Sequence, residues 1–272
     1  MNLEIYQVDA FTTEPFHGNP AAVVPLDAWL PDETMQKIAL ENNLSDTGFF
    51  VKEGDKYHIR WFTPSVEVPL CGHATLASAH ILFNELKAAK DSITFLSKSG
   101  ELRVDRQGDR LVLDFPAIFV DRIESADAII AALGKQPVAI YKATDYLVIY
   151  DSEETIASLT PDFNALNKTD ARGVIVTAPG NSVDFVSRFF GPGFGITEDP
   201  VTGSAHCALT PYWAQELGKN SLTARQISAR GGDVFCELAG DRVKIGGYAA
   251  LYLKGEIVLE EAHKEAAASS LK

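Results

Sequence analysis

Short runs in which apolar and polar residues alternate fill most of this chain, and Gly, Pro, Asn or Asp bounds most of them. A period of two, with many β-branched and aromatic side chains, is typical of strands that bury one face. Strands are therefore expected at residues 5–11, 21–24, 47–51, 57–62, 92–95, 110–115, 146–149, 173–176, 183–189, 243–245 and 250–253. Because they lack the regular strand-helix spacing of a doubly wound sheet, the pattern predicts an α+β fold.

Two segments have the period of a peripheral helix. The first begins after Pro31, has an acidic first turn at 32–33 and carries one apolar face. The second covers about 125–133, with Ser125 as its N-cap and Gly134 at its end.

Two further helices are expected at about 74–86 and 205–217. Both are rich in alanine and apolar on nearly every face, and Gly218 stops the second. A helix of this composition is buried on most sides. The pattern therefore favours central helices that are wrapped by sheet.

The chain contains an internal repeat. Residues 67–74 match residues 198–205 at a constant offset of 131. Residues 60–64 match residues 188–192 once three extra residues are allowed in the second copy. Each copy is a strand, a Pro/Gly loop, a Gly turn and an apolar helix, so one supersecondary unit is used twice. We expect two similar half-domains related by a pseudo-twofold axis, each a mostly antiparallel curled sheet around a central helix.

The boundary between the halves is expected where Phe115-Pro116 closes the first set of strands. This predicts a first half-domain at 1–116 and a second at 117–262, and leaves open whether the C-terminal strand returns to the first half. Residues 263–272 are rich in Ala, Ser and Lys without periodicity, and a disordered tail is expected there.

Charge and composition exclude several classes of function. The 37 acidic residues outnumber the 24 basic ones, for a formal charge of −13, and no Lys/Arg run could follow phosphates. Nucleic acid and membrane are therefore not expected as partners. No apolar stretch approaches the roughly 20 residues that cross a bilayer, and no export signal is evident. Three cysteines are too few for a disulfide framework, so a cytoplasmic location is expected.

The two Gly turns are candidate ligand sites. Gly72-His73 and Gly203-Ser204 each stand just before an apolar helix, where free backbone N–H groups and the positive end of the helix dipole attract anions. Two such turns facing each other would grip a carboxylate-bearing substrate without a basic side chain. The simpler interpretation is that the glycines are turn residues, and that His73 and Ser204 are N-caps.

Other polar residues give weaker local signals. The local sequence alone predicts that Asp46 and Asn19 are ordinary turn residues. A metal site built from Cys71, His73 and the adjacent His206-Cys207 pair does not match the usual zinc spacings. No metal and no coenzyme are expected.

Taken together, several short motifs carry a family resemblance over nearly the whole chain. They are Val-Asp-Ala-Phe at 8–11, Phe-His-Gly-Asn-Pro-Ala at 16–21, Asn-Leu-Ser-Asp-Thr at 43–47, Phe-Thr-Pro at 62–64, Cys-Gly-His-Ala at 71–74, Gly-Ile-Thr-Glu-Asp-Pro at 195–200 and Thr-Gly-Ser at 202–204. The chain resembles the PhzF-like family, within the superfamily of diaminopimelate epimerase and proline racemase. The resemblance implies two similar halves with the active site in the cleft between them.

The resemblance also implies roles for individual residues. The acidic residue after the Asn-Leu-Ser run serves as general acid/base in the family, and here it is Asp46. His73 and Asp199 would assist catalysis. The substrate contacts implied are Asn19, Gly72, Thr202, Gly203 and Ser204. The family commonly has Glu where this chain has Asp46, which shortens the reach of the carboxyl by one methylene.

The resulting expectation is a cofactor-independent isomerase that moves a proton on a small carboxylated metabolite, as a homodimer of the kind common in the family. One alternative is a binding protein for small acids that has lost the chemistry. Another is an epimerase variant that uses Cys71 as a base. Two-thiol chemistry needs a second cysteine, but Thr202 occupies the equivalent position of the second repeat.

Overall fold

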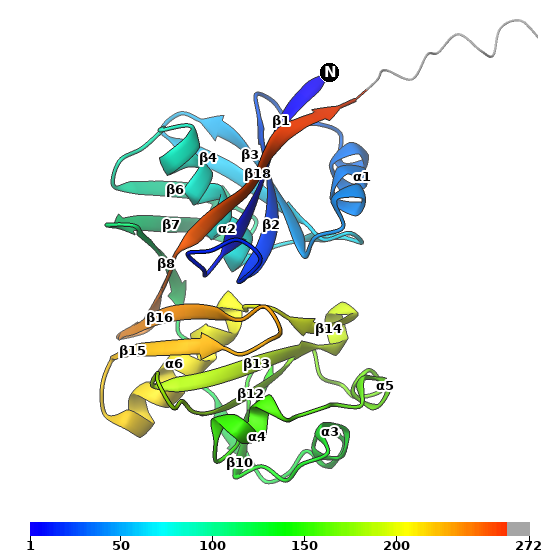
Figure 1. Ribbon diagram of the computed structural model, residues 1–272, viewed down its shortest axis with the longest axis vertical. Coiled ribbons are helices and arrows are strands. Elements are labelled where there is room, and N and C mark those ends of the chain that lie inside the picture. The colour runs from blue at the N-terminus through cyan, green and yellow to red at the C-terminus, as the bar shows by residue number, and fades with distance from the viewer. Residues whose placement is uncertain (260–272) are drawn as a thin grey trace, which may run out of the picture.

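The computed structural model describes residues 1–259. Two lobes of similar size are stacked along the long axis, with the first half of the chain in one lobe and most of the second half in the other (Figure 1). The tail expected at 263–272, and the last residues of the second half-domain expected at 117–262, lie outside the described residues.

The first lobe contains a sheet, a central helix and one peripheral helix. Its elements are β1 (Asn2–Ala10), β2 (Asn19–Leu26), α1 (Asp32–Asn42), β3 (Asp46–Glu53), β4 (Lys56–Phe62), β5 (Glu67–Val68), α2 (Gly72–His80), the π-helical turn η1 (Ile81–Glu85), β6 (Ser92–Ser97), β7 (Gly100–Gln107) and β8 (Arg110–Pro116).

The second part of the chain repeats this arrangement with short helices at its edge. Its elements are β9 (Asp121–Ile123), α3 (Asp127–Leu133), β10 (Ala139–Lys142), β11 (Tyr146–Ile149), α4 (Glu153–Ala157), α5 (Phe163–Leu166), β12 (Val174–Pro179), β13 (Phe185–Gly191), the 3₁₀ turn η2 (Pro192–Phe194), β14 (Ile196–Asp199), α6 (Gly203–Leu217), β15 (Ser221–Gln226), β16 (Gly232–Ala239), β17 (Arg242–Gly247) and β18 (Ala249–Val258).

Strand pairing is the same in both lobes. In the first, β1–β2 is antiparallel, β2–β3 parallel, β3–β4 antiparallel, β4–β6 parallel, and β6–β7 and β7–β8 antiparallel. In the second, β10–β11, β11–β12, β12–β13, β13–β15, β15–β16 and β16–β17 follow the same order of directions. The duplication expected from the short repeat therefore extends over both halves, and the α+β expectation is confirmed.

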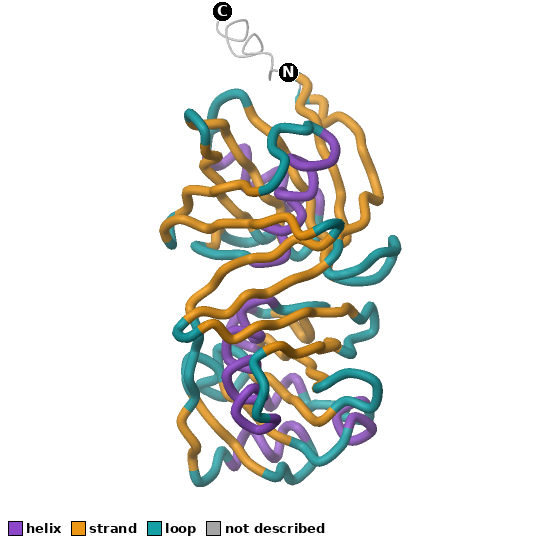
Figure 2. The backbone as a smooth tube through the Cα atoms, turned by 90° about the vertical axis from the view of Figure 1, so that its left-hand side faces the viewer, coloured by secondary structure: helices purple, strands orange, loops and turns teal. Residues whose placement is uncertain are grey.

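The two lobes share one continuous sheet. The equivalent strands β8 and β17 pair antiparallel, with Leu113 opposite Ile245, and this joins the lobes at the waist of the molecule (Figure 2). The C-terminal strand β18 pairs antiparallel with β1 in the first lobe, from Asn2 opposite Val258 to Ala10 opposite Ala249. The chain thus returns to the half in which it began.

The central helices α2 and α6 are buried as expected. Residues 73–79 of α2 are buried without a break, and α6 exposes only Ser204 in its first two turns. Both helices begin two residues before the expected starts. Gly218 ends α6 in the left-handed conformation, as predicted, whereas α2 passes into the π-helical turn η1.

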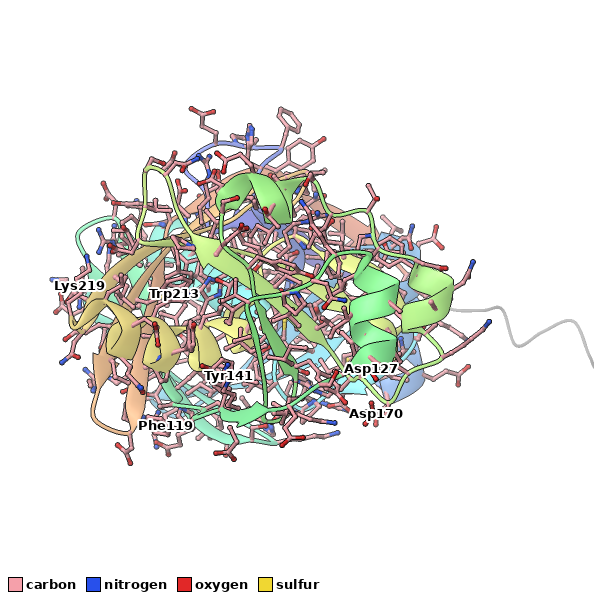
Figure 3. The ribbon with its side chains drawn as sticks, turned by 90° about the horizontal axis from the view of Figure 1, so that it is seen from below. Phe119, Asp127, Tyr141, Asp170, Trp213 and Lys219 are labelled. Carbon is pink, nitrogen blue, oxygen red and sulfur yellow. The ribbon has the colours of Figure 1, made fainter. Side chains whose placement is uncertain are left out.

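The helix α6 packs on the sheet of the second lobe as part of the large apolar core that also includes residues of the first lobe. Trp213, labelled in Figure 3, stacks on Phe185 of β13 with ring centroids 5.6 Å apart and an interplanar angle of 4°. Its indole N–H donates to Thr177 Oγ1 on β12 at 3.0 Å. The helix is therefore tied to the sheet by both apolar packing and a buried hydrogen bond.

Local expectations were partly wrong. The peripheral helix α1 begins after Pro31 with Met35 and Ile38 buried, as predicted. The N-cap of α3, however, is Ala126 and not Ser125, whose hydroxyl instead donates to the carboxylate of Asp127. The pattern also missed strands β5, β7, β9, β10, β14, β15 and β16 and the short helices α4 and α5. None of the helices in the described part of the chain is both long and apolar enough to span a bilayer.

Candidate active site

The N-termini of α2 and α6 meet at the centre of the molecule. A methyl group built on Gly72 would lie 3.5 Å from the Cα of Gly203, and one built on Gly203 would lie 3.6 Å from the Cα of Gly72. Both helices therefore direct the positive ends of their dipoles at one region. The Gly turns that the repeat singled out face each other, as expected.

The N-caps of the two helices are Cys71 and Thr202, both with extended backbone. Neither side chain makes the usual capping hydrogen bond to its helix. The interpretation of His73 and Ser204 as N-caps is therefore wrong, because both residues lie inside the first turn. Uncapped first turns keep backbone N–H donors available for an anion.

Asp46 is the first residue of β3, where it is aligned with Ala21 of the parallel strand β2. The side chain is buried, and its Oδ1 has no hydrogen-bond partner among the described residues. Burial raises the pKa of this carboxyl to about 7, and the negative charge of Asp199 adds to the rise, while a hydrogen bond with Cys71 opposes it. Asp46 is thus poised to gain or lose a proton near neutral pH.

His73 and Cys71 lie beside Asp46. The Nε2 of His73 is 3.8 Å from Asp46 Oδ2, and its Nδ1 is 3.4 Å from Cys71 Sγ. Burial lowers the pKa of His73 to about 3, so the imidazole is neutral at pH 7. Burial, with the nearby Asp46 charge, raises the pKa of Cys71 well above its usual range. The thiol is therefore protonated at neutral pH.

Asp199 is held by a hydrogen-bond network from both halves of the chain. Asn19 Nδ2 donates to Asp199 Oδ1 at 2.8 Å and also to the carbonyl of Val201 at 2.9 Å. Thr202 Oγ1 donates to Asp199 Oδ2 at 2.5 Å. Burial raises the pKa of Asp199 to about 6, although these two donors oppose the rise. The carboxyl is thereby fixed in place, and its pKa lies within about one unit of neutral pH.

Gln226, the last residue of β15, completes this network. Its Nε2 donates to the carbonyl of Asp199 at 2.7 Å, and its Oε1 accepts the backbone N–H of Thr202 at 2.9 Å. No sequence pattern pointed to Gln226, because it lies in a polar stretch that was not predicted to be a strand. Its buried amide holds the turn that leads into α6.

Asn19 reaches Asp199 because of the loop before it. Gly18 has φ +63, and a Cβ there would lie 2.1 Å from the carbonyl oxygen of Ala10, so only glycine fits. Arg230 clamps this loop by donating to the carbonyl of Gly18 at 2.8 Å and to Asp9 Oδ1 at 2.9 Å. The backbone N–H of Gly18 donates to the carbonyl of Gly231. This clamp fixes the two halves to each other beside the site.

Not every expected site residue lies in the buried cluster. Asp46, His73, Asn19 and Thr202 are buried, and Asp199 is half-buried. Ser204 has an exposed side chain, although it is the repeat equivalent of the buried His73. The two halves of the cluster therefore differ in chemistry at matched positions.

The residues that could hold a cation differ from the set considered from the sequence. Ligand atoms of Asp46, Cys71 and His73 all lie within 4.8 Å of one another. In contrast, Cys207 is a small residue of the apolar core, and His206 Nδ1 lies 2.8 Å from the carbonyl of Thr202.

Comparison with known proteins gives a consistent assignment. The family model for phenazine biosynthesis-like proteins, PhzC-PhzF, matches residues 8–255. An uncharacterized isomerase of Pseudomonas aeruginosa is 57% identical over 260 residues, which cover 95% of this chain and 100% of the relative.

Solved structures show the same fold. The crystal structure of a PhzF-family protein from Enterococcus faecalis has a TM-score of 0.93 and 51% identity, over 95% of this chain and 100% of that one. A hydroxyproline epimerase from Agrobacterium vitis has a TM-score of 0.64 at 10% identity, over 96% and 93% of the two chains, and shares the fold. The chain belongs to the PhzC-PhzF family of phenazine biosynthesis-like proteins.

Proposed function

We propose that this protein is an isomerase that moves a proton on a small carboxylated metabolite, with Asp46 as the group that carries the proton and without a coenzyme. Family membership and a relative named as an isomerase support the class of reaction. The observation that carries the assignment is the buried Asp46 carboxyl, with its pKa near 7 and one oxygen that has no partner among the described residues.

In this proposal Asp46 begins ionised and takes a proton from a carbon next to an unsaturated or carboxylated group of the substrate. It then returns the proton to a different carbon of the same molecule, so no net proton is gained or lost. A base is most effective when its pKa lies close to the working pH, since both its protonation states are then accessible. The raised pKa of Asp46 meets that condition.

The converging helices α2 and α6 supply the electrostatic part of the mechanism. Negative charge develops on the substrate carboxylate as the proton leaves carbon. First-turn N–H groups near Gly72 and Gly203 stabilise that charge because they are fixed before the reaction begins. The site thus favours an acidic substrate in a protein of net negative charge.

His73 and Asp199 assist from opposite halves. The neutral imidazole of His73, with Nε2 3.8 Å from Asp46 Oδ2, is placed to pass a proton or to bind a polar group of the substrate. Asp199 is oriented by Asn19 and Thr202, and its charge helps to keep the pKa of Asp46 high. We assign Asn19, Thr202 and Gln226 as positioning residues for Asp199.

The two alternatives fit the site less well. A thiol epimerase would need a thiolate at Cys71, but the pKa of this thiol lies well above its usual range, and Thr202 stands at the matched position. A binding protein without chemistry would gain nothing from a buried carboxyl that ionises only at about pH 7 and above, since burial of such a group costs stability.

The test is proton NMR in D₂O with a panel of small cyclic and unsaturated carboxylic acids. Wild type is compared with Asp46→Asn and with Asp121→Asn, an exposed aspartate of β9 that controls for the loss of charge. Isomerisation or deuterium uptake by wild type and Asp121→Asn, but not by Asp46→Asn, supports the proposal. Exchange that is equally fast in Asp46→Asn contradicts it, and binding of the acids without exchange in any of the three favours the binding protein.

A further inference from the structure

We propose that Asp46, Cys71 and His73 form a binding site for a borderline-soft divalent ion such as Zn²⁺, and that the bound ion blocks the isomerase. The binding part stands on the geometry of three side chains. The blocking part rests on the proposed function, since it requires that Asp46 be the proton carrier.

The three side chains offer one oxygen, one sulfur and one nitrogen in a small volume. With one ligand atom taken from each residue, all three atoms lie within 4.8 Å of one another. The two shorter contacts use different ring nitrogens, since Cys71 Sγ is 3.4 Å from His73 Nδ1, whereas Asp46 Oδ2 is 3.8 Å from His73 Nε2. Zinc bonds of about 2.0–2.3 Å in a tetrahedron place ligand atoms about 3.3–3.7 Å apart. An ion can bind only one of the two ring nitrogens, so His73 must turn its ring and the ligand atoms must close in from a separation of up to 4.8 Å to surround one ion.

The orphaned polar atoms of the cluster point to a ligand. Asp46 Oδ1 and His73 Nε2 are both buried and without a hydrogen-bond partner among the described residues, and the two residues as a whole are 8% and 6% exposed. Leaving such atoms unpaired costs stability. A single ion between them would satisfy both, as would a polar group of the substrate.

Charge balance favours a dication. When Cys71 binds the ion as a thiolate, its proton passes to solvent, and the thiolate with the Asp46 carboxylate offsets the two positive charges. No Lys or Arg is among the causes that shift the pKa values of Asp46, Cys71 or His73, whereas Asp199 acts on the first two. A buried complex of three protein ligands without net charge avoids much of the desolvation cost of an isolated ion.

The donor set selects among metals. Thiolate and imidazole favour Zn²⁺, Co²⁺ and similar ions, whereas Mg²⁺ and Ca²⁺ prefer oxygen ligands alone. An ion at this place would bind the Asp46 oxygen that carries the proton. The site is therefore a point at which a transition metal switches the enzyme off.

The test is direct binding of Co²⁺ and Zn²⁺ to the purified chain after treatment with a chelator. Wild type is compared with Cys71→Ser, His73→Asn and the control Cys207→Ala, which removes a buried thiol of α6 outside the cluster. Circular dichroism and thermal melting show which variants are folded. We expect one Co²⁺ per chain with a thiolate charge-transfer band in wild type and Cys207→Ala, and competition by Zn²⁺ but not by Mg²⁺.

Loss of the thiol ligand should weaken Zn²⁺ binding by more than about 100-fold, because even outer-shell changes cost about 10–100-fold. Folded Cys71→Ser that binds Zn²⁺ as tightly as wild type would overturn the proposal, as would a charge-transfer band that disappears in Cys207→Ala. This readout does not use activity. Failure of the isomerase proposal would therefore leave metal binding in place, and failure of metal binding would leave the isomerase proposal in place.

Discussion

Gly72 and Gly203 touch at the N-termini of two helices that come from opposite halves of the chain, since a methyl group on either would lie 3.5–3.6 Å from the Cα of the other. The contact brings Asp46 with His73 from one half near Asp199 with Thr202 from the other. A duplicated scaffold thus gives a site whose two sides carry different chemistry.

Asp46→Asn should lower kcat/KM by about 10²- to 10⁴-fold, the usual cost of removing a general acid or base. Asparagine has nearly the same shape and cannot accept the proton. Steady-state kinetics on the substrate found by the NMR panel measures the effect. A variant that keeps more than about a tenth of the activity would show that Asp46 is not the general acid/base.

Cys71→Ser should change kcat/KM by less than about tenfold, far less than the loss of an acid/base group. The thiol is protonated at neutral pH, because burial and the Asp46 charge raise its pKa, so it does not carry the reacting proton. The same kinetic assay measures this. A loss as large as that of Asp46→Asn would instead favour the thiol epimerase.

The rate should depend on pH through Asp46. In wild type kcat/KM should rise with pH and level off above about pH 7, because the ionised carboxyl is the base. Asp199→Asn removes a negative charge that raises the pKa of Asp46, so the inflection should move to lower pH. An inflection that stays in place would show that Asp199 exerts no such influence.

The pH dependence of the free energy of unfolding should also reflect the titration of Asp46. The pKa of Asp46 is raised from 3.8 to about 7 on folding, so the folded chain binds the proton more tightly than the unfolded chain. The resulting stabilisation is complete below about pH 4, decreases as the pH rises and is lost above about pH 7. The free energy of unfolding of wild type, relative to Asp46→Asn, should therefore fall over this range in urea titrations. A constant difference would contradict the assignment.

Leu76→Ala should destabilise the protein by about 2–5 kcal/mol, because Leu76 is fully buried on the central helix α2 and its truncation leaves a cavity. Leu40→Ala, on the exposed face of α1, is the matched control and should cost much less. Denaturant unfolding compares the two variants. Equal losses would contradict the burial of α2 by the sheet.

Much of the fold was predictable because it is repeated. Two features indicated two similar halves: the apolar helices with their Gly turns, and the matched segments ahead of them. The structure confirms that the two halves are similar. Local chemistry placed the end of α6 at Gly218 and the start of α1 after Pro31. The division at residue 116 stays a prediction, with β18 paired to β1 across it.

Other elements carried weaker signals. Strands β7, β15 and β16 were missed because they hold many charged or polar residues on their exposed faces, and pairing with neighbours decides such strands. The switch from α2 to the π-helical turn η1 has no sequence signal that we can identify.

The site residues were predicted from the family resemblance, whereas the distances and hydrogen bonds between them are known only from the structure. The proximity of Asp46 to Cys71 and His73 depends on how β3 packs beside α2, which no local pattern shows. Gln226 was not predictable, because its role comes from two hydrogen bonds to residues 24 and 27 positions earlier in the sequence. From the sequence, a metal site of Cys71, His73, His206 and Cys207 was considered and set aside because its spacing does not match that of zinc sites, whereas the structure groups Cys71 and His73 with Asp46.

The titration of Asp46 can be followed directly in the free protein by ¹³C NMR of its side-chain carboxyl carbon, with Asp46→Asn to assign the signal. We expect a midpoint near pH 7 in wild type and a lower midpoint in Asp199→Asn. A midpoint at or below about pH 4, the ordinary range of an aspartate, would mean that the carboxyl is not poised to move protons at neutral pH and that Asp46 is not the proton carrier.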